Sequence, residues 1–347
     1  MKFWSEKIRK IKPYVPGEQP LDKKYIKLNT NENPYPPSPK VIEALQAETG
    51  ADVRLYPDPD ATALKKALAG FYHVEPNEVF VGNGSDEVLA FCFPAFFNPE
   101  DAIAFPEITY SFYPVYADLF GVPYVTVPMN EDFTFNPDGF QAGMKGILLA
   151  NPNAPTGIAL GMDAVEKLVN RFPDTLIIVD EAYVDFGGQS AIPLVHRHEN
   201  LLVIHTFSKS RALAGLRIGY AIGNAALIEG LERVKNSFNS YTLDRMAQCA
   251  ATASASDPEY TRRMCERIIR TRDNVRTKLL DMGLDVLPSS TNFLFVSHRN
   301  FTGSELFLRL KQQGILVRHF QRPGIENWLR VSMGTEEEMA ILIQKLE

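Results

Sequence analysis

At 347 residues the chain is long enough for two domains, because single hydrophobic cores stop growing beyond roughly 300 residues. Hydrophobic residues make up 45% of the chain and charged residues 22%, which is typical of a soluble globular protein. The net charge of -6 argues against a nucleic-acid-binding surface, which needs an excess of Lys and Arg.

The cysteines and the N-terminal residues exclude further classes of protein. Cys92, Cys249 and Cys265 lie far apart, so neither a disulfide framework nor a metal site is expected. Residues 1–12 lack the apolar core of a signal peptide. No run approaches the roughly 18 apolar residues of a membrane-spanning helix, so no membrane partner is expected. These features favour a cytoplasmic enzyme.

The first two thirds of the chain read as an arm followed by an α/β domain. Residues 12–39 are rich in Pro and Asn, which predicts an extended N-terminal arm over residues 1–39. Apolar runs and helical patterns then alternate, which predicts a large domain over residues 40–255, with a mainly parallel sheet between helices. Strands are expected over 78–81, 102–105, 124–127, 146–150, 176–179, 201–205 and 218–222, and helices over 85–97 and 163–171. The last four strands are nearly continuous apolar runs, typical of strands buried on both faces.

The pattern changes after about residue 256. The order of elements there predicts a smaller α+β domain over residues 256–347. A long charged helix is expected over 259–282, followed by a strand over 292–296, a helix over 304–313, strands over 315–318 and 329–332, and a closing helix.

Polar clusters follow four of the predicted strands. They are Gly-Asn-Gly-Ser-Asp-Glu at 82–87, Asn-Pro-Asn at 151–153, Asp-Glu-Ala-Tyr at 180–183 and Thr-Phe-Ser-Lys at 206–209. Because ligands collect at the carboxyl ends of parallel strands, we expect these clusters to form one site.

Single residues of these clusters also allow structural interpretations. Ser85 could be an ordinary N-cap, or could lie in a glycine-rich turn whose N–H groups bind an anion. Asp180 favours a function, because a carboxylate at the end of a buried strand is costly unless it is paired. Lys209 could pair with a carboxylate or act as a nucleophilic amine. Arg217, eight residues further on, could clamp a phosphate or lie at the surface.

The run around Lys209 carries a family resemblance. Residues 206–220 read TFSKSRALAGLRIGY and closely resemble the lysine signature of class II aminotransferases, which are pyridoxal-phosphate (PLP) enzymes of fold type I. The runs NPNAPTG (151–157) and VDEAY (179–183) precede it in the order of that family. More narrowly, the chain is similar to the histidinol-phosphate aminotransferase family. The similar runs are KLNTNENPY (27–35), RLYPD (54–58), VGNGSDE (81–87), VR (317–318) and WLRV (328–331).

The resemblance implies roles for the cofactor residues. Lys209 is implied to bind PLP covalently and later to move a proton, which requires a neutral amine. Asp180 is implied to pair with the pyridine nitrogen, and Tyr110 to stack on the ring. Asn151 and Tyr183 are implied to hydrogen-bond the 3-oxygen of the ring. The implied contacts to the PLP phosphate are Ser85, Asp86, Thr206, Ser208 and Arg217.

The resemblance also implies a partner subunit and substrate contacts. Tyr56 would reach the PLP phosphate of the other subunit of a homodimer. Arg330 would bind the carboxylate of the amino donor and the substrate phosphate, with Arg318 and Tyr14 as further phosphate contacts. Arg318 could instead pair with an acidic neighbour. The arm residues Asn31, Glu32 and Asn33 would close the pocket near the imidazole of the substrate.

The implied reaction is transamination of L-histidinol phosphate with 2-oxoglutarate, giving imidazole acetol phosphate and glutamate in histidine biosynthesis. An aromatic-amino-acid aminotransferase and a threonine-phosphate decarboxylase stay open as alternatives on the same scaffold. A PLP-binding regulator is disfavoured, because only about thirty residues precede the large domain, too few for a DNA-reading module. Arg245 lies in an unusual stretch (241–245) and could alter the phosphate end of the pocket.

Overall fold

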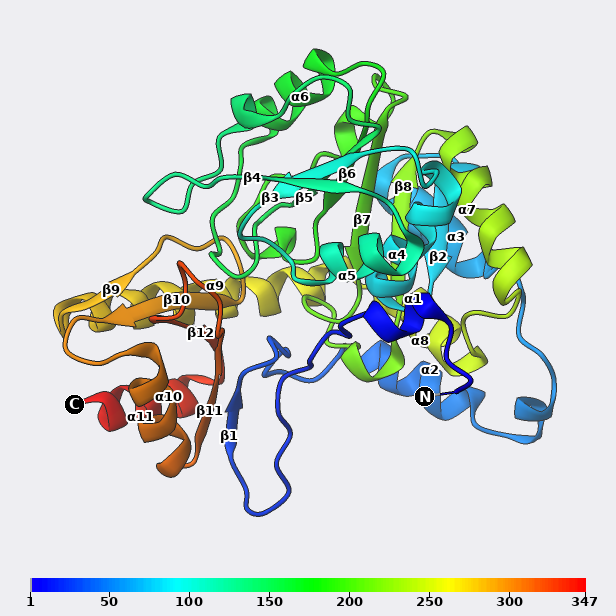
Figure 1. The fold of residues 1–347 in the computed structure, drawn as a ribbon. Coiled ribbons are helices and arrows are strands. Elements are labelled where there is room, and N and C mark those ends of the chain that lie inside the picture. Colours follow the sequence, from blue (N-terminus) through cyan, green and yellow to red (C-terminus); the bar gives the residue numbers. More distant parts are fainter. Residues whose placement is uncertain (1) are drawn as a thin grey trace.

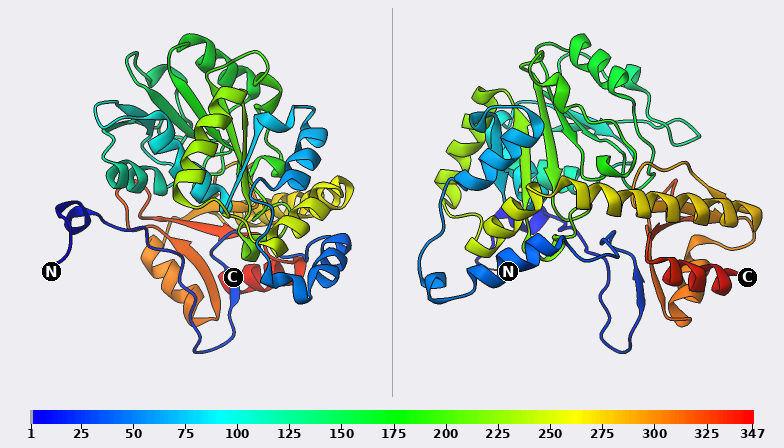
Figure 2. Two further views of the ribbon diagram at one scale, coloured as in Figure 1. Left: turned by 90° about the vertical axis from the view of Figure 1, so that its right-hand side faces the viewer. Right: turned by 180° about the vertical axis from the view of Figure 1, so that it is seen from behind.

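The computed structural model describes residues 2–347 and contains two sheets, each with its own helices (Figures 1 and 2). The larger sheet has seven strands in the order β2-β8-β7-β6-β5-β3-β4. These strands are β2 (Val79–Gly82), β3 (Ile103–Pro106), β4 (Tyr124–Val127), β5 (Gly146–Ala150), β6 (Leu176–Asp180), β7 (Leu201–Thr206) and β8 (Gly219–Gly223). All of them run parallel except β8, which is antiparallel to both β2 and β7. The predicted α/β fold with a mainly parallel sheet is confirmed.

Each predicted strand of the large domain is present, displaced by no more than one residue at either end. The strands β5, β6, β7 and β8 are buried along nearly their whole length, as their continuous apolar runs predict. The strand β4 lies at the edge of the sheet and is mostly exposed.

Helices cover both faces of the large sheet (Figure 1). One face packs against α3 (Thr62–Tyr72), α6 (Met162–Arg171) and α8 (Arg245–Ala255), and α2 (Pro39–Glu48) packs on α8. The other face packs against α4 (Gly84–Phe96), α5 (Phe112–Phe120) and α7 (Ala225–Phe238). Successive residues of a strand point to opposite faces, so Val179 lies in the first core and Ile178 in the second.

The smaller sheet has five strands in the order β1-β11-β12-β10-β9. Its antiparallel strands are β9 (Leu284–Val286), β10 (Phe293–His298), β11 (Ile315–His319) and β12 (Trp328–Ser332). The helices α9 (Pro258–Asp281), α10 (Gly303–Gln312) and α11 (Glu336–Leu346) pack against this sheet. Capping boxes at Thr302 and Thr335 fix the starts of α10 and α11.

The N-terminal arm contributes to the smaller sheet, which the sequence did not predict. The strand β1 (Ile26–Leu28) pairs in parallel with β11 from the far end of the chain. Three residues are too few to show a strand period, so only the distant partner reveals it. The arm begins with α1 (Glu6–Lys10), and short 3-10 helices occur at Ala51–Arg54, Pro76–Glu78, Pro137–Gly139, Val184–Phe186, Ile192–Leu194 and Ala214–Leu216. The boundaries expected at residues 39 and 255 stay predictions.

No helix within residues 2–347 is both long and apolar enough to cross a lipid bilayer. The same residues hold no group of three or more His, Cys, Asp or Glu side chains placed to bind a metal ion.

Candidate active site

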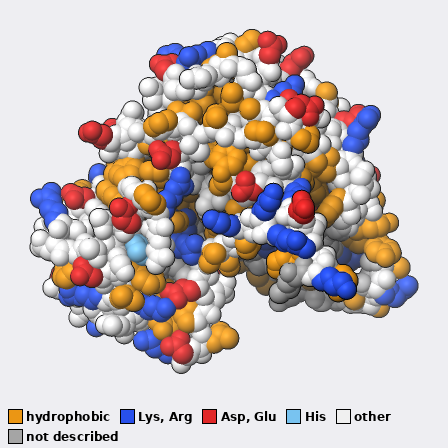
Figure 3. Space-filling model, in the orientation of Figure 1, with side chains coloured by type: hydrophobic (Ala, Val, Ile, Leu, Met, Phe, Trp, Pro, Cys, Tyr) orange, Lys and Arg blue, Asp and Glu red, His pale blue; other side chains and the backbone are white. Residues whose placement is uncertain are grey.

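A cavity of about 500 Å³ lies at the carboxyl ends of the central strands, between the large sheet, the arm and the smaller sheet. Figure 3 shows the molecule hollowed between its two lobes, with Lys and Arg side chains gathered around the hollow. Most of the predicted site residues line this cavity: Tyr14, Ser85, Asp86, Tyr110, Asp180, Tyr183, Thr206, Ser208, Lys209, Arg217, Arg318 and Arg330.

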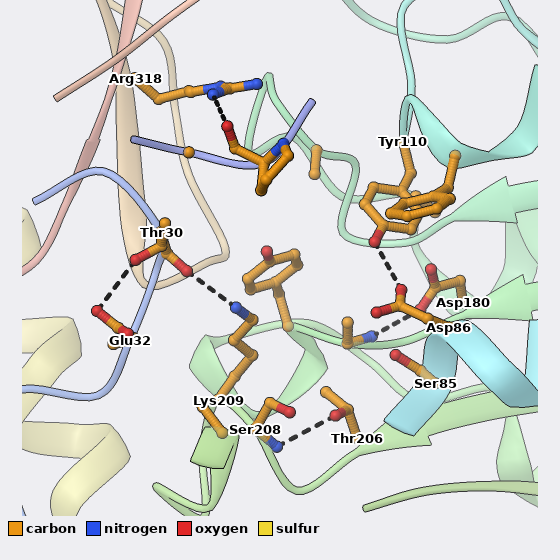
Figure 4. A pocket seen from close by; sticks show the side chains of 18 of the residues that line it. Thr30, Glu32, Ser85, Asp86, Tyr110, Asp180, Thr206, Ser208, Lys209 and Arg318 are labelled. Atoms are coloured by element: carbon orange, nitrogen blue, oxygen red, sulfur yellow. Dashed lines mark hydrogen bonds between the residues drawn. The ribbon is translucent and has the colours of Figure 1, made fainter. Parts of the chain in front are cut away.

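Lys209 follows the end of β7 and reaches toward the arm (Figure 4). Its Nζ donates to the carbonyl oxygen of Thr30 at 3.1 Å and lies 5.8 Å from the ring centroid of Tyr183. The amine is therefore held at the cavity by an acceptor from the arm. Sequence reasoning missed Thr30, because it acts through its backbone carbonyl, which every residue type possesses.

Asp180 is the last residue of β6 and is only 5% exposed. Its Oδ2 accepts from the hydroxyl of Tyr113 at 3.3 Å, and its Oδ1 accepts from the N–H of Ala182 at 3.2 Å. Burial raises the pKa of Asp180 to about 7, and the nearby charge of Asp86 acts in the same direction. No Lys, Arg or His within residues 2–347 forms an ion pair with it, so this carboxylate lacks a cationic partner.

A tight turn opens α4 at the edge of the cavity. Gly84 has φ +82°, and a Cβ on it would lie 2.4 Å from Nη2 of Arg217. A Cβ on Gly219 would lie 2.2 Å from the backbone nitrogen of Ser85. The two glycines therefore let the start of α4 approach the guanidinium group closely. Free N–H groups at a helix start beside an arginine form an anion-binding site.

Side chains around this turn are already connected to one another. Arg217 donates to Oδ2 of Asp86 at 3.1 Å and to Oγ of Ser208 at 3.4 Å. Tyr110 donates to Oδ1 of Asp86 at 2.7 Å, and burial raises the pKa of the Tyr110 hydroxyl well above its usual range, which keeps it a neutral donor. Thr206 accepts from the N–H of Ser208 at 3.1 Å. The turn thus gathers N–H and O–H donors around the start of α4, where the Arg217 guanidinium packs directly against Gly84.

Two arginines face each other at the opposite end of the cavity. Arg318 of β11 and Arg330 of β12 are paired residues in the antiparallel register. Like charges placed directly opposite destabilise a sheet, and an anion between them removes the penalty. Loss of solvent lowers the pKa of Arg330, and the charge of Arg318 acts in the same direction. The pair therefore concentrates positive charge at this end of the cavity.

The arm supplies the present partners of these arginines. Arg318 donates to the carbonyl oxygens of Val15 and Pro16 at 2.9 and 3.1 Å, and it pairs with no carboxylate of residues 2–347. The acidic partner considered for it is thus not found. Arg330 donates to the carbonyl of Asn29 at 3.3 Å, and its Nε has no partner.

Three predicted site residues do not line the cavity. Asn33 donates to the carbonyl oxygens of Lys209 and Ser210, at 3.0 and 3.2 Å, and so holds the loop that carries the lysine. Asn151 turns its amide to the backbone of Leu160, at 3.1 and 2.8 Å. Tyr56 is 77% exposed. The roles expected for these side chains stay predictions.

The expectation for Arg245 stays a prediction. Its guanidinium pairs with Glu48 of α2 at 2.9 Å, and Arg245 is not among the residues that line the cavity. Arg245 therefore links α8 to α2 within its own subunit, while Tyr241 at the start of the same stretch stacks on Tyr56. Sequence reasoning could not place Arg245, because its acceptor lies almost two hundred residues earlier.

The family model for aminotransferases of class I and II matches residues 23–346 of the chain. The chain belongs to this family. The aminotransferase is 50% identical over 346 residues to a histidinol-phosphate aminotransferase of Clostridium acetobutylicum, covering 100% of this chain and 98% of the relative. It is 52% identical over 349 residues to histidinol-phosphate aminotransferase 2 of Dechloromonas aromatica, covering 99% and 98%.

A solved structure supports the fold and the cofactor. The histidinol-phosphate aminotransferase of Sinorhizobium meliloti, solved in complex with pyridoxal 5'-phosphate, matches this aminotransferase with a TM-score of 0.90 at 26% identity. The match covers 99% of this chain and 96% of that chain.

The cavity fits PLP on its own chemistry. The buried carboxylate of Asp180, which has no cationic partner in the described part of the chain, suits a protonated pyridine nitrogen, and the helix start at Gly84 with Arg217 packed beside it suits a phosphate. Lys209, whose amine would bind the cofactor, lines the same cavity. The predicted activity class, a PLP-dependent aminotransferase, is confirmed by the family and by this fit.

Proposed function

We propose that this aminotransferase transfers the amino group of L-histidinol phosphate to 2-oxoglutarate, giving imidazole acetol phosphate and glutamate. The observation that carries the proposal is the opposed pair Arg318 and Arg330. The phosphate of histidinol phosphate and the carboxylates of glutamate both bring anions to this pair. An aromatic amino acid would bring only one singly charged carboxylate to this pair, whereas a phosphate carries nearly two charges. The names of the relatives at about 50% identity support the same substrate.

Residues of the chain prepare the site for proton transfer. Bound PLP supplies the aldehyde that takes up the amino group and a ring that withdraws electrons from the reacting carbon. Lys209 Nζ would take the proton from the substrate carbon that bears the amino nitrogen and would release it to the carbon on the other side of that nitrogen, while the carbonyl of Thr30 orients the amine. Asp180 holds a proton on the ring nitrogen. Tyr183 would donate its hydroxyl hydrogen to the 3-oxygen, and Asn151 would donate to the same atom the amide N–H that does not bond Leu160.

The remaining cofactor residues hold the ring and the phosphate. Tyr110 covers the ring from the start of α5. The N–H groups at the start of α4 point to the phosphate, and the positive end of the helix favours its charge. The phosphate would be bound by Ser85, Asp86, Thr206, Ser208 and Arg217, all of which line the cavity.

The arm and the smaller sheet bind the substrate anion. Arg330 keeps N–H groups free for it, and Arg318 exchanges one arm carbonyl for a phosphate oxygen. Tyr14 stacks on Phe112 with ring centroids 4.2 Å apart, which places it at the mouth of the cavity. Asn33 acts through the backbone of Lys209.

Arg318→Gln tests the substrate assignment. We expect KM for histidinol phosphate to rise about 10- to 100-fold, because hydrogen bonds to a charged group contribute about 1.5–3 kcal/mol. Turnover of phenylalanine, measured in parallel, should change much less, since its singly charged carboxylate can be bound by Arg330 alone. Arg318→Lys, which keeps the charge, should lie between the wild type and Arg318→Gln. Equal losses for both donors would mean that Arg318 only anchors the arm.

Tyr56 supports a homodimer. It stacks on Tyr241 with ring centroids 4.5 Å apart. Tyr56 is 77% exposed and Tyr241 is 40% exposed, and neither lines the cavity of its own subunit. A paired aromatic surface of this kind favours a protein partner. We propose that the partner is a second copy of the chain. The Tyr56 hydroxyl of one subunit would then reach the PLP phosphate bound to the other subunit.

Mixing two inactive variants tests the crossing of Tyr56. If it crosses, a dimer of Tyr56→Phe and Lys209→Ala subunits contains one site with both native residues. That site should bind PLP with wild-type affinity, measured by fluorescence titration. No recovery in subunits shown to have exchanged would mean that Tyr56 serves its own subunit.

A further inference from the structure

Asn31 joins the arm to three other parts of the molecule. Its backbone N–H donates to Oγ of Ser332 at 2.8 Å, and the same hydroxyl donates back to its Oδ1 at 2.8 Å. Its carbonyl accepts from Nδ2 of Asn292 at 3.0 Å, and its own Nδ2 donates to the hydroxyl of Tyr183 at 2.9 Å. Asn31 is 1% exposed, so these buried polar groups are all satisfied by specific partners.

The backbone of Asn31 turns the chain at this point. Its φ is +55°, in the left-handed region that Asn tolerates better than most residues. The preceding carbonyl, that of Thr30, is thereby directed at Nζ of Lys209 (Figure 4). One residue thus fixes an acceptor for the catalytic amine through its backbone and a donor to Tyr183 through its side chain.

The bond to Tyr183 also has a direction. Because the Tyr183 oxygen accepts from Asn31, its own hydrogen is free to be donated elsewhere. Tyr183 lines the cavity, so the available acceptor is the 3-oxygen of PLP. The anchor of Asn31, Ser332, lies two residues after Arg330 on β12. The strand that binds the substrate anion therefore also holds Asn31.

We propose that Asn31 is a positioning residue that orients the Tyr183 hydroxyl and the Lys209 amine and ties both to the substrate-binding strand β12. This inference rests on the roles proposed above for Lys209 and Tyr183. Asn31→Gly is the sharpest variant, because glycine keeps the left-handed backbone and removes only the side-chain amide.

The visible absorption of bound PLP, titrated with pH, reports on Tyr183. A hydrogen bond donated to the 3-oxygen makes this oxygen a weaker acceptor for the proton on the nitrogen that joins PLP to the chain. The pKa of that nitrogen is therefore lower when the hydrogen bond is present. Asn31→Gly should therefore move the midpoint of the absorption change to higher pH by about half a unit, the size of one ordinary hydrogen bond. We expect kcat to fall roughly tenfold, with KM for 2-oxoglutarate changing less than threefold.

Two further variants test whether the shift in the midpoint depends on Tyr183. Tyr183→Phe should move the midpoint in the same direction and further, and adding Asn31→Gly to it should move it no more. Ser332→Ala removes the hydroxyl that holds Asn31 but keeps Asn31 itself, so it should give a smaller shift of the midpoint. This variant replaces Asn31→Gly in the test if Asn31→Gly does not fold. As a control, Asn200→Ala removes a side chain that donates to the Val169, Phe172 and Thr175 carbonyls away from the cavity, and it should leave the midpoint unchanged.

The outcomes separate the two levels of the proposal. A midpoint that stays unchanged in Asn31→Gly and Ser332→Ala, while Tyr183→Phe shifts it, overturns the role of Asn31 alone. A midpoint unchanged in Tyr183→Phe overturns the proposed role of Tyr183 and the inference built on it. Additive shifts in the double variant also contradict the inference, because they would mean that Asn31 acts by another route.

Discussion

Replacing Lys209 with alanine is expected to abolish transamination, lowering kcat by about 10⁴-fold or more, because one amine both binds the cofactor and moves the proton. Its Nζ faces the cavity, and the structure places no second lysine in the lining of that cavity among residues 2–347. Borohydride reduction followed by mass spectrometry measures the covalent bond between the protein and the cofactor aldehyde. The Lys209→Ala protein should carry no such adduct.

The matched control for this result is Lys40→Ala. Lys40 is an exposed lysine near Asp257, with 3.6 Å between Nζ and Oδ1, and it lies outside the cavity lining. That variant should retain the adduct at the wild-type level. A reducible adduct that survives in Lys209→Ala, at any other lysine, would refute the assignment of the cofactor-binding residue.

Replacing Asp180 with asparagine is expected to leave PLP bound and to lower kcat by about 10²–10³-fold, the usual cost of losing one preorganised charge. The amide cannot hold a proton on the ring nitrogen, so the ring withdraws electrons less strongly. Single-turnover rates with glutamate, followed by the cofactor absorption, measure this loss. A loss of less than tenfold with full PLP occupancy would show that Asp180 does not contact the ring nitrogen.

Asp180 also makes the stability of the cofactor-free protein depend on pH. Its pKa is about 7 in the folded protein, against 3.8 for an ordinary aspartate, so the folded state binds more protons between these pH values. The free energy of unfolding should then fall as pH rises from about 4 to 7, by at most about 4 kcal/mol. Cofactor-free Asp180→Asn should lack this fall in urea titrations at several pH values. The same pH slope in both proteins would contradict the buried, unpaired carboxylate.

The large sheet was predictable because its strands carry local signals. Strands such as β6 and β7 are unbroken apolar runs that end in polar residues, and parallel strands bring those ends together. The cofactor residues Asp180 and Lys209 follow from this rule. The motifs around them then pointed to one family.

The arm was predicted least well, because its structure depends on distant partners. The strand β1 exists only through β11, and Asn31 acquires its contacts from Ser332 and Asn292, about three hundred residues away in sequence. Tyr113, which bonds Asp180, lies in an aromatic helix and looks like an ordinary core residue from its sequence. Such roles come from tertiary contacts that no local pattern contains.

The amino donor is the central claim, and one comparison tests it most directly. The wild-type protein is mixed separately with L-histidinol phosphate, phenylalanine and O-phosphothreonine, and the loss of the visible absorption of bound PLP is followed in each half-reaction. The opposed pair Arg318 and Arg330 predicts that histidinol phosphate reacts fastest. Faster reaction with phenylalanine, or release of carbon dioxide from phosphothreonine, would contradict the proposed function.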